Sequence, residues 1–320
     1  MQAISFPGYR RAEIIEIPRP ALRDPGDAIV LVTTAAIGPW DVERFLSVGS
    51  ERIIPGGEFA GLVVETGEDV TDVEIDDLVT NTVNHVSSNG QSGLFGSKTL
   101  PGGHAEYVRV PDANTTLTKI AESGEERAVL AGGTVGIGVN AAALALSLGM
   151  PSVTVVGCDP IGMTALVALR NAGSIENLVA VEDHAARNTL ASKFADHTFK
   201  STDQLPGQLS DVVLVGSINE YAGFETVATL VKPGGSVLFS EKYGPARVAE
   251  SGIEFPEGVT ISTAAWPTNQ DAKKIVTAMQ IRKLDLTPLV SHVIPFDEVQ
   301  DAYEAAAGPG QGVQKVLLKP

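Results

Sequence analysis

Hydrophobic positions along the 320-residue chain follow one spacing before residue 125 and another after it. In the first part, β-branched runs at residues 28–35, 59–66 and 105–110 are separated by glycine and proline. Short runs bounded by turn residues are typical of strands. Many strands at short spacing predict a small barrel or sandwich over residues 1 to about 118.

After residue 125, strand-like and helix-like runs alternate. We expect helices over residues 126–130, 138–148, 161–172, 185–195, 221–231 and 272–284, and within 295–307. We expect strands over residues 152–156, 178–181, 211–215, 236–239, 259–265 and 313–318, with a turn at 232–235. This alternation predicts an α/β fold in which helices cover both faces of a parallel sheet. The α/β unit is inserted into a β-rich domain whose two parts flank it.

The stretch from Ser152 to Gly162 joins a buried strand to a helix through a glycine turn. Free backbone N–H groups and the helix dipole favour an anion there, so this geometry receives a dinucleotide pyrophosphate. The sequence motif expected for such a turn is G-x-G-x-x-G, and the chain has Gly157-Cys158-Asp159-Pro160-Ile161-Gly162. An aspartate thus replaces the glycine whose missing side chain lets the pyrophosphate approach the backbone.

Asp159 has three interpretations. It is tolerated, with a shifted cofactor or a bridging water, or it marks the loss of nucleotide binding. Alternatively it caps the helix, because Asp at the N-cap followed by Pro at the first helical position is a favoured start. Two like charges about 4 Å apart cost roughly 1–4 kcal/mol, which is up to about a thousandfold in affinity. Such a carboxylate weakens dinucleotide binding without strictly abolishing it.

Composition narrows the classes of function. A hydrophobic content of 43% with 19% charged residues is typical of a globular protein. The formal net charge of −16 would repel a nucleic acid. The N-terminus lacks the order of a signal peptide, and no apolar run reaches the roughly 20 residues of a membrane helix. The single cysteine, Cys158, excludes an intrachain disulfide. We expect a cytoplasmic protein with a small-molecule substrate that binds neither nucleic acid nor membranes.

Five motifs occur in an order known from one superfamily. They are GGEFAG (56–61) followed by VETG (64–67), PGGHAEYV (101–108), the glycine turn at 157–162, VKPGG (231–235) and KLDLTPLV (283–290). In these motifs the chain resembles, from end to end, the medium-chain dehydrogenase/reductase superfamily of zinc alcohol dehydrogenases and zinc-free quinone reductases. The resemblance implies a GroES-like catalytic domain over residues 1–131 and 265–320. It also implies an inserted Rossmann dinucleotide-binding domain over residues 132–264, with the active cleft between the two domains.

Both zinc sites of that superfamily are altered. Zinc members carry Cys-x-x-Asp where this chain has Gly38-Pro39-Trp40-Asp41, and Gly-His-Glu where it has Gly56-Gly57-Glu58. The third ligand would fall near Gly133, which has no ligating side chain. A catalytic zinc needs three protein ligands, which Asp41 and Glu58 alone do not supply. The structural-zinc lobe would lie within residues 84–100, which contain no cysteine. We therefore expect no zinc of either kind.

The candidate cofactor-binding residues surround the glycine turn. They are Gly157, Asp159, Pro160, Ile161, Gly162, Glu182 and Gly216. Glu182 ends the second predicted strand of the nucleotide unit, where an acidic residue hydrogen-bonds the adenosine ribose. Because a carboxylate there repels a 2′-phosphate, NAD(H) is preferred over NADP(H). The alternative for Glu182 is that it is a solvated acid in a loop. Because Arg187 lies nearby in the sequence, NADP(H) remains the alternative cofactor.

Chemistry without zinc needs another proton donor or electrophile. His85 follows a strand-like run in the region that lines the substrate pocket of the resembled superfamily, so it is the candidate acid or base. Its alternative is an exposed loop histidine. Trp40 would fill the metal's space and offer a stacking surface. Glu58 would transfer protons if desolvation raised its pKa, or is a salt-bridged structural acid, and Asp41 belongs to the same candidate catalytic site.

Two hypotheses of function follow. The first is a zinc-independent oxidoreductase that transfers a hydride between a nicotinamide cofactor and a small carbonyl, alcohol or activated alkene. The second, which Asp159 favours, is a family member that has lost redox function and binds a small molecule or catalyses non-redox chemistry. We interpret His104 as structural and Cys158 as a packing residue. The resemblance further implies a homodimer through the last Rossmann strand, residues 259–265.

Overall fold

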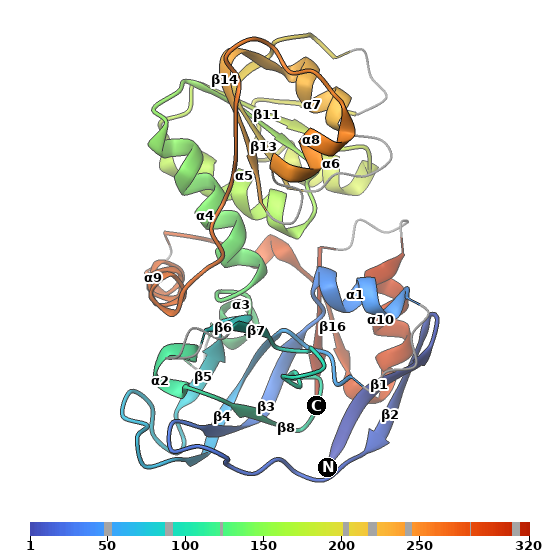
Figure 1. Cartoon of the computed structure of the whole chain (residues 1–320), viewed down its shortest axis with the longest axis vertical. Helices are drawn as coiled ribbons and strands as arrows, with labels where there is room; N and C mark the ends of the chain where they lie inside the picture. Colours follow the sequence, from blue (N-terminus) through green and yellow to red (C-terminus); the bar gives the residue numbers. More distant parts are fainter. Residues whose placement is uncertain are drawn as a thin grey trace. The chain divides into compact units, whose positions relative to one another are not determined.

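The chain divides into two compact units. A computed structural model describes residues 1–47, 53–86, 92–121, 124–200, 205–216, 223–240, 245–281, 283–308 and 314–320. Unit 1 comprises Met1–Gly133, Pro267–Gly308 and Lys315–Pro320, and unit 2 comprises Thr134–Trp266 and Pro309–Gln314. Figure 1 labels most of the helices and strands of both units. The predicted insertion of an α/β unit into a β-rich one is therefore the architecture of the chain.

Unit 2 is built on a six-stranded parallel sheet. Its strands are β10 (Ser152–Val156), β11 (Asn177–Val181), β12 (His197–Phe199), β13 (Ser210–Val215), β14 (Val231–Phe239) and β15 (Thr260–Thr263). They lie in the order β12-β11-β10-β13-β14-β15, and every adjacent pair is parallel. Counted along the chain this is the order 3-2-1-4-5-6 of a Rossmann fold, with its switch point at the carboxyl ends of β10 and β13.

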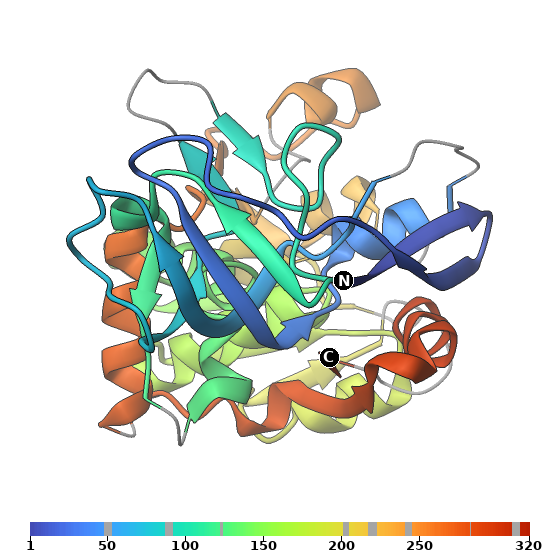
Figure 2. The ribbon, with the colours of Figure 1, turned by 90° about the horizontal axis from the view of Figure 1, so that it is seen from below.

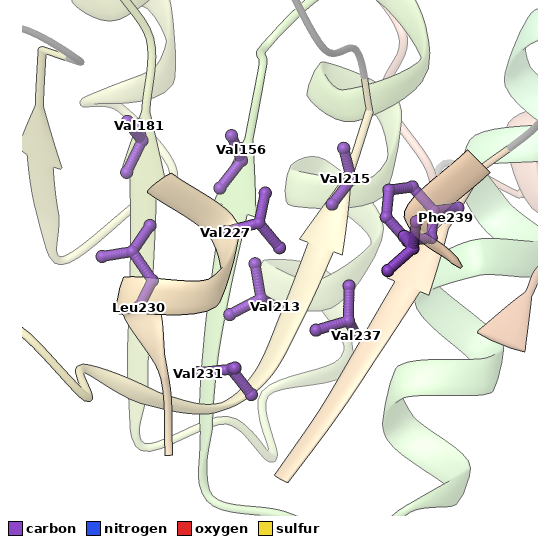
Figure 3. Packing of buried hydrophobic residues seen from close by; sticks show 10 residues of the cluster. Val156, Val181, Val213, Val215, Val227, Leu230, Val231, Val237 and Phe239 are labelled. Atoms are coloured by element: carbon purple, nitrogen blue, oxygen red, sulfur yellow. The ribbon is translucent and has the colours of Figure 1, made fainter. Parts of the chain in front are cut away.

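The central strands β10, β11 and β13 are buried along almost their whole length because helices cover the sheet. Its helices are α4 (Thr134–Ser147), α5 (Pro160–Ala172), α6 (Ala185–Ala191), α7 (Phe224–Leu230) and α8 (Pro245–Ser251). Figure 3 shows Val227 and Leu230 of α7 in one group with Val181, Val213 and Val237 of the sheet. These side chains belong to one buried cluster, which fixes the strands that carry the glycine turn.

Unit 1 contains a mostly antiparallel sheet of seven strands. They are β3 (Ala28–Ala36), β4 (Glu58–Thr66), β5 (Leu78–Asn81), β8 (Tyr107–Val110), β9 (Leu117–Lys119), β16 (Val290–Pro295) and β17 (Lys315–Lys319). The order is β16-β17-β3-β4-β5-β9, and β8 pairs with β3. In Figure 2 the blue β3 and the green β8 run side by side. The C-terminal β17 thus joins a sheet made of N-terminal strands.

Shorter elements complete unit 1. The pairs β1 (Gln2–Gly8) with β2 (Arg11–Glu16) and β6 (Asn84–Val86) with β7 (Ser92–Leu94) form two-stranded sheets. The helices are α1 (Pro39–Phe45), α2 (Ala113–Thr116), α3 (Glu125–Ala128), α9 (Asn269–Gln280) and α10 (Val299–Ala307), with two 3₁₀ turns at Thr287–Leu289 and Phe296–Glu298. In the described part of the chain, none of the helices is long and apolar enough to cross a membrane.

Several predicted bounds differ from the observed ones. The predicted helix at 138–148 begins earlier, at Thr134, and the one at 272–284 is shifted to Asn269–Gln280. The first two residues of the helix predicted at 221–231 lie outside the described residues, and α7 begins at Phe224. The turn predicted at 232–235 lies within β14, where Gly234 has a φ of 74°.

Candidate functional site

Three glycines lie together where β10 and β13 end and α5 begins: Gly157 in the turn between β10 and α5, Gly162 in the first turn of α5 and Gly216 directly after β13. Gly157 has a φ of 77°, a backbone conformation that favours glycine, and its N–H donates to Val181 O at 2.9 Å. A Cβ on Gly162 would overlap the carbonyl oxygen of Gly157, and a Cβ on Gly216 would lie 2.5 Å from the same oxygen. Gly162 and Gly216 therefore have no room for side chains, which brings the start of α5 close to the ends of β10 and β13.

Asp159 is the N-cap of α5. Its backbone is extended, with φ −62° and ψ 177°, and its Oδ1 accepts a hydrogen bond from the Gly162 N–H at 2.9 Å. Pro160 follows at the first helical position, where its missing N–H is not needed. The capping interpretation of Asp159 is therefore confirmed. A carboxylate of the chain itself holds an amide of the first turn of α5, where a bound anion would be held in an uncapped helix.

Burial raises the pKa of Asp159 to about 6. The hydrogen bond from Gly162 and the guanidinium of Arg187 oppose this rise, whereas the nearby Glu182 adds to it. Asp159 is therefore mostly ionised at pH 7.5, and its protonated fraction grows as the pH falls towards 6.

Replacing Asp159 with asparagine is expected to stabilise unit 2 at neutral pH. Because the folded-state pKa of about 6 exceeds the ordinary value of 3.8, the folded protein binds the proton more tightly than the unfolded chain. Stability therefore falls as pH rises from about 4 to about 6, by at most about 3 kcal/mol. Asparagine caps a helix about as well as aspartate, and because it does not ionise it avoids this pH-dependent loss of stability. Urea unfolding should show the gain at pH 7.5 and almost none at pH 4, whereas an equal gain at both values would contradict this.

Glu182 stabilises the turn from inside the protein. It follows β11 directly and is 4% exposed. Its Oε2 accepts from the Cys158 N–H and its Oε1 from the His184 N–H, both at 2.8 Å. Both carboxylate oxygens thus already bind backbone donors. The residue lies where sequence reasoning placed the ribose-binding acid, but its observed contacts hold the glycine turn in place.

Two nitrogen atoms beside Glu182 are buried without a hydrogen-bond partner. Arg187 Nε lies 3.6 Å from Glu182 Oε1, an ion pair without hydrogen-bond geometry, and His184 Nδ1 is also unsatisfied. Both residues belong to the start of α6, with His184 at its N-cap. Sequence reasoning found Arg187 but missed His184, because nothing in its spacing distinguishes it from a loop histidine.

In unit 1, the indole of Trp40 fills the space beside two of the altered zinc positions. A Cβ on Gly38 would lie 2.9 Å from Trp40 Cε2, and a Cβ on Gly57 would overlap Trp40 Nε1. At the third position, a Cβ on Gly133 would overlap Glu58 Oε1 and lie 2.6 Å from Val83 Cγ1. Any side chain at these three positions would therefore collide with its surroundings.

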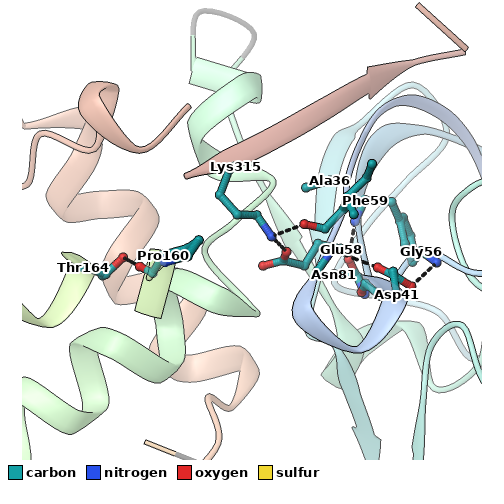
Figure 4. A network of polar contacts seen from close by, with 12 residues as sticks. Ala36, Asp41, Gly56, Glu58, Phe59, Asn81, Pro160, Thr164 and Lys315 are labelled. Atoms are coloured by element: carbon teal, nitrogen blue, oxygen red, sulfur yellow. Dashed lines mark hydrogen bonds and ion pairs between the residues drawn. The ribbon is translucent and has the colours of Figure 1, made fainter. Parts of the chain in front are cut away.

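Glu58 forms a buried ion pair with Lys315. Both side chains are 1% exposed, and Lys315 Nζ also donates to Ile37 O at 2.8 Å. Figure 4 shows the ammonium group of Lys315 facing the Glu58 carboxylate. The charge of Glu58 is thus neutralised within unit 1 by a lysine of β17.

Asp41 and His104 belong to the same buried region. Asp41 is fully buried and accepts hydrogen bonds from the N–H groups of Gly38 and Gly56, both at 2.9 Å. Figure 4 shows the bond from Gly56. His104 is also fully buried, with its Nδ1 2.6 Å from the Tyr303 hydroxyl and its Nε2 3.3 Å from Ala36 O. Burial lowers the pKa of His104, so the neutral ring is favoured. These bonds support a structural role for both residues.

The remaining predicted residues are placed as follows. His85 lies in β6 opposite Gly93 of β7, but its side chain lies outside the described part of the structure, so its catalytic role stays a prediction. Ile161 and Cys158 are buried in the glycine turn, which agrees with packing roles. Among the described residues, no group of three or more His, Cys, Asp or Glu side chains could hold a metal ion.

The N-terminal half of unit 1 matches a known family. The profile described as "Alcohol dehydrogenase GroES-like domain" matches residues 24–122. An alcohol dehydrogenase of Cupriavidus necator is 24% identical, over 100% of this chain and 99% of its own. An uncharacterized zinc-type alcohol dehydrogenase-like protein of Bacillus subtilis is 26% identical, over 100% of both chains. The chain belongs to the medium-chain dehydrogenase/reductase superfamily.

Solved structures of the superfamily share the fold over the whole chain. An alcohol dehydrogenase from Thermus sp. ATN1 has a TM-score of 0.85 at 22% identity, covering 100% of this chain and 99% of its own. Two further neighbours were solved with cofactors. One from Escherichia coli CFT073 holds NADH (TM-score 0.81, 20% identity, 100% and 99% covered), and one from Sinorhizobium meliloti 1021 holds NADP (TM-score 0.80, 18% identity, 100% and 99% covered). This medium-chain dehydrogenase/reductase is thus an oxidoreductase by family.

Proposed function

We propose that the protein is a zinc-independent, nicotinamide-dependent oxidoreductase that acts on a small carbonyl, alcohol or activated alkene. The observation that carries the proposal is the close packing of three glycines, Gly157, Gly162 and Gly216, at the switch point of a 3-2-1-4-5-6 sheet. When bound, the nicotinamide supplies or accepts the hydride. The chain's own residues have to bind the dinucleotide, orient the substrate and provide a proton.

Independence from zinc is supported by the residues that stand where zinc members carry their metal ligands. The three positions where zinc members carry ligands are Gly38, Gly57 and Gly133 in this chain, and the space beside each is filled by other side chains. The acid retained next to them, Glu58, is paired with Lys315. A zinc site needs three protein ligands, so these residues do not fit the metal and no step is assigned to it.

The dinucleotide site fits its ligand in part. The closely packed glycines Gly157, Gly162 and Gly216 offer the close backbone approach that a pyrophosphate needs, whereas Asp159 already holds the Gly162 amide. The choice of NAD(H) rests on the position of Glu182. Arg187, whose Nε has no hydrogen-bond partner, supports NADP(H) as the alternative.

Proton transfer is assigned to His85 as a prediction from sequence alone. Glu58 and Asp41 are at most 1% exposed and their carboxylates hold internal partners, which favours positioning roles for both. Trp40 is 7% exposed and supports the neighbouring glycine backbone.

The proposal is tested by titrating EDTA-dialysed protein with NADH and with NADPH. We expect enhanced nicotinamide fluorescence with saturation in the micromolar range, and the same affinity after zinc is added back. Added zinc that raises the affinity or activity many-fold would contradict the metal-free assignment. A substrate screen of aldehydes, ketones and activated alkenes would then follow NADH oxidation.

A family member without redox function is the second candidate, and the capping contact of Asp159 favours it. Failure to bind either cofactor at millimolar concentration would support this candidate and exclude the first. We also propose a cytoplasmic homodimer that pairs through β15, an edge strand of the unit 2 sheet, and sedimentation velocity tests the dimer.

A further inference from the structure

The anion-binding end of α5 is already occupied by an anion of the chain. Asp159 Oδ1 lies 2.9 Å from the Gly162 nitrogen, an amide in the first turn of a 13-residue helix. A dinucleotide pyrophosphate in a glycine turn is held by N–H groups of the same first turn. An ionised Asp159 and a bound pyrophosphate would thus compete for these donors and repel each other at close range.

The other charged groups around Asp159 do not remove this conflict. The guanidinium of Arg187, on α6, lowers the pKa of Asp159 electrostatically, and the carboxylate of Glu182, at the end of β11, raises it. Arg187 is also the ion-pair partner of Glu182, at 3.6 Å. The buried Cys158 thiol is kept neutral because burial raises its pKa. Among the described residues, one cation is therefore shared by two carboxylates before any phosphate arrives.

Protonation of Asp159 would resolve the conflict. The Arg187–Glu182 pair would then be balanced, and the carboxyl group would become a hydrogen-bond donor to a phosphate oxygen. We propose that the dinucleotide binds together with one proton that Asp159 takes up from solvent. This inference rests on the proposed function, and it makes cofactor affinity depend on pH through a single side chain.

The size of the effect follows from the proton affinity of the free site. Burial raises the pKa of Asp159 to about 6, so the protonated form is a minor species of about 3% at pH 7.5. The wild-type affinity for NADH is then reduced about thirtyfold at that pH relative to a fully protonated site. It should rise about tenfold for each unit that the pH falls from 8 towards 6 and become constant below about pH 5.5.

The test is isothermal titration calorimetry of the full-length protein with NADH at pH 7.5 in buffers of different ionisation enthalpy. The slope of the observed heat against the buffer enthalpy counts the protons taken up. NADH is used in place of NADPH because a 2′-phosphate titrates near pH 6 and would add its own proton. We expect about one proton for the wild type. For Asp159→Asn, which keeps the cap, we expect none and an affinity about thirtyfold higher.

A matched control removes one carboxylate elsewhere in unit 2. Glu176→Gln, at an exposed position directly before the start of β11, should leave both proton uptake and affinity unchanged. Wild-type binding without proton uptake would overturn the proposal and leave the proposed function intact. Uptake that persists in Asp159→Asn would also overturn it, because a group other than Asp159 would then take up the proton. Failure of both the wild type and Asp159→Asn to bind NADH would overturn the proposed function itself.

Discussion

Replacing Lys315 with methionine is expected to lower the free energy of unfolding by about 3–5 kcal/mol. Methionine keeps an apolar stem but removes the ammonium that hydrogen-bonds Glu58 and the Ile37 carbonyl. Because Glu58 is 1% exposed, its carboxylate would remain in the interior of unit 1 without its cation. Urea unfolding followed by circular dichroism measures the loss.

Two further variants isolate the buried pair. Lys319→Met removes a lysine from the same strand, but Lys319 is 35% exposed and its ion pairs with Glu125 and Glu126 are 3.8 and 3.7 Å long, so we expect a loss below about 1 kcal/mol. Combining Lys315→Met with Glu58→Leu should recover most of the stability, because an apolar pair replaces an ionic one. Equal losses for Lys315→Met and Lys319→Met would contradict the role of the buried pair.

Replacing Asp159 with glycine is expected to increase the affinity for NADH at pH 7.5 by between about tenfold and a thousandfold. The substitution restores the G-x-G-x-x-G motif and frees the Gly162 amide for a pyrophosphate. It also removes a like charge at close range, which is worth roughly 1–4 kcal/mol. Loss of the cap itself should cost only a few tenths of a kcal/mol, since glycine is an acceptable N-cap. Nicotinamide fluorescence titration measures the change.

Glu182, the other carboxylate beside this turn, provides the control for Asp159→Gly. Glu182→Gln should lower stability because an amide NH₂ cannot accept the bonds that both carboxylate oxygens now receive from Cys158 and His184. It should not reproduce the gain in affinity seen for Asp159→Gly. An unchanged affinity in Asp159→Gly, with binding intact in the wild type, would mean that the carboxylate does not oppose the cofactor.

Much of the fold could be predicted from local patterns. Alternation of apolar strands and helices gave the parallel sheet, and the Asp-Pro pair at Asp159 predicted the observed helix cap. The start of α4 was missed because Gly136 and Gly138 lower helix propensity. In the structure, a Cβ on Gly138 would lie 2.6 Å from Ile161 O, so the glycine serves a close approach of α4 to α5. The start of α4 thus depends on tertiary packing, which cannot be read from a local sequence pattern.

The candidate site was less accessible to sequence reasoning. Lys315 and Glu58 are 257 positions apart, and only the pairing of β17 with β3 in a shared sheet brings them together. Glu182 was found at the expected position, but its two backbone hydrogen bonds depend on where the turn and α6 begin. The start of helix α9 was also misplaced, at residue 272, although the Thr268–Asp271 capping box marks its observed start at Asn269.

The position of Trp40 has a consequence for how this chain could change by successive substitutions. Its indole occupies the space beside both Gly38 and Gly57, so a cysteine or histidine introduced at either position would meet it first. A single substitution that introduces a metal-binding side chain at either position would therefore destabilise the protein before it could bind metal. Trp40 has to become smaller before such a side chain fits. The order of the substitutions is thus constrained by one aromatic side chain.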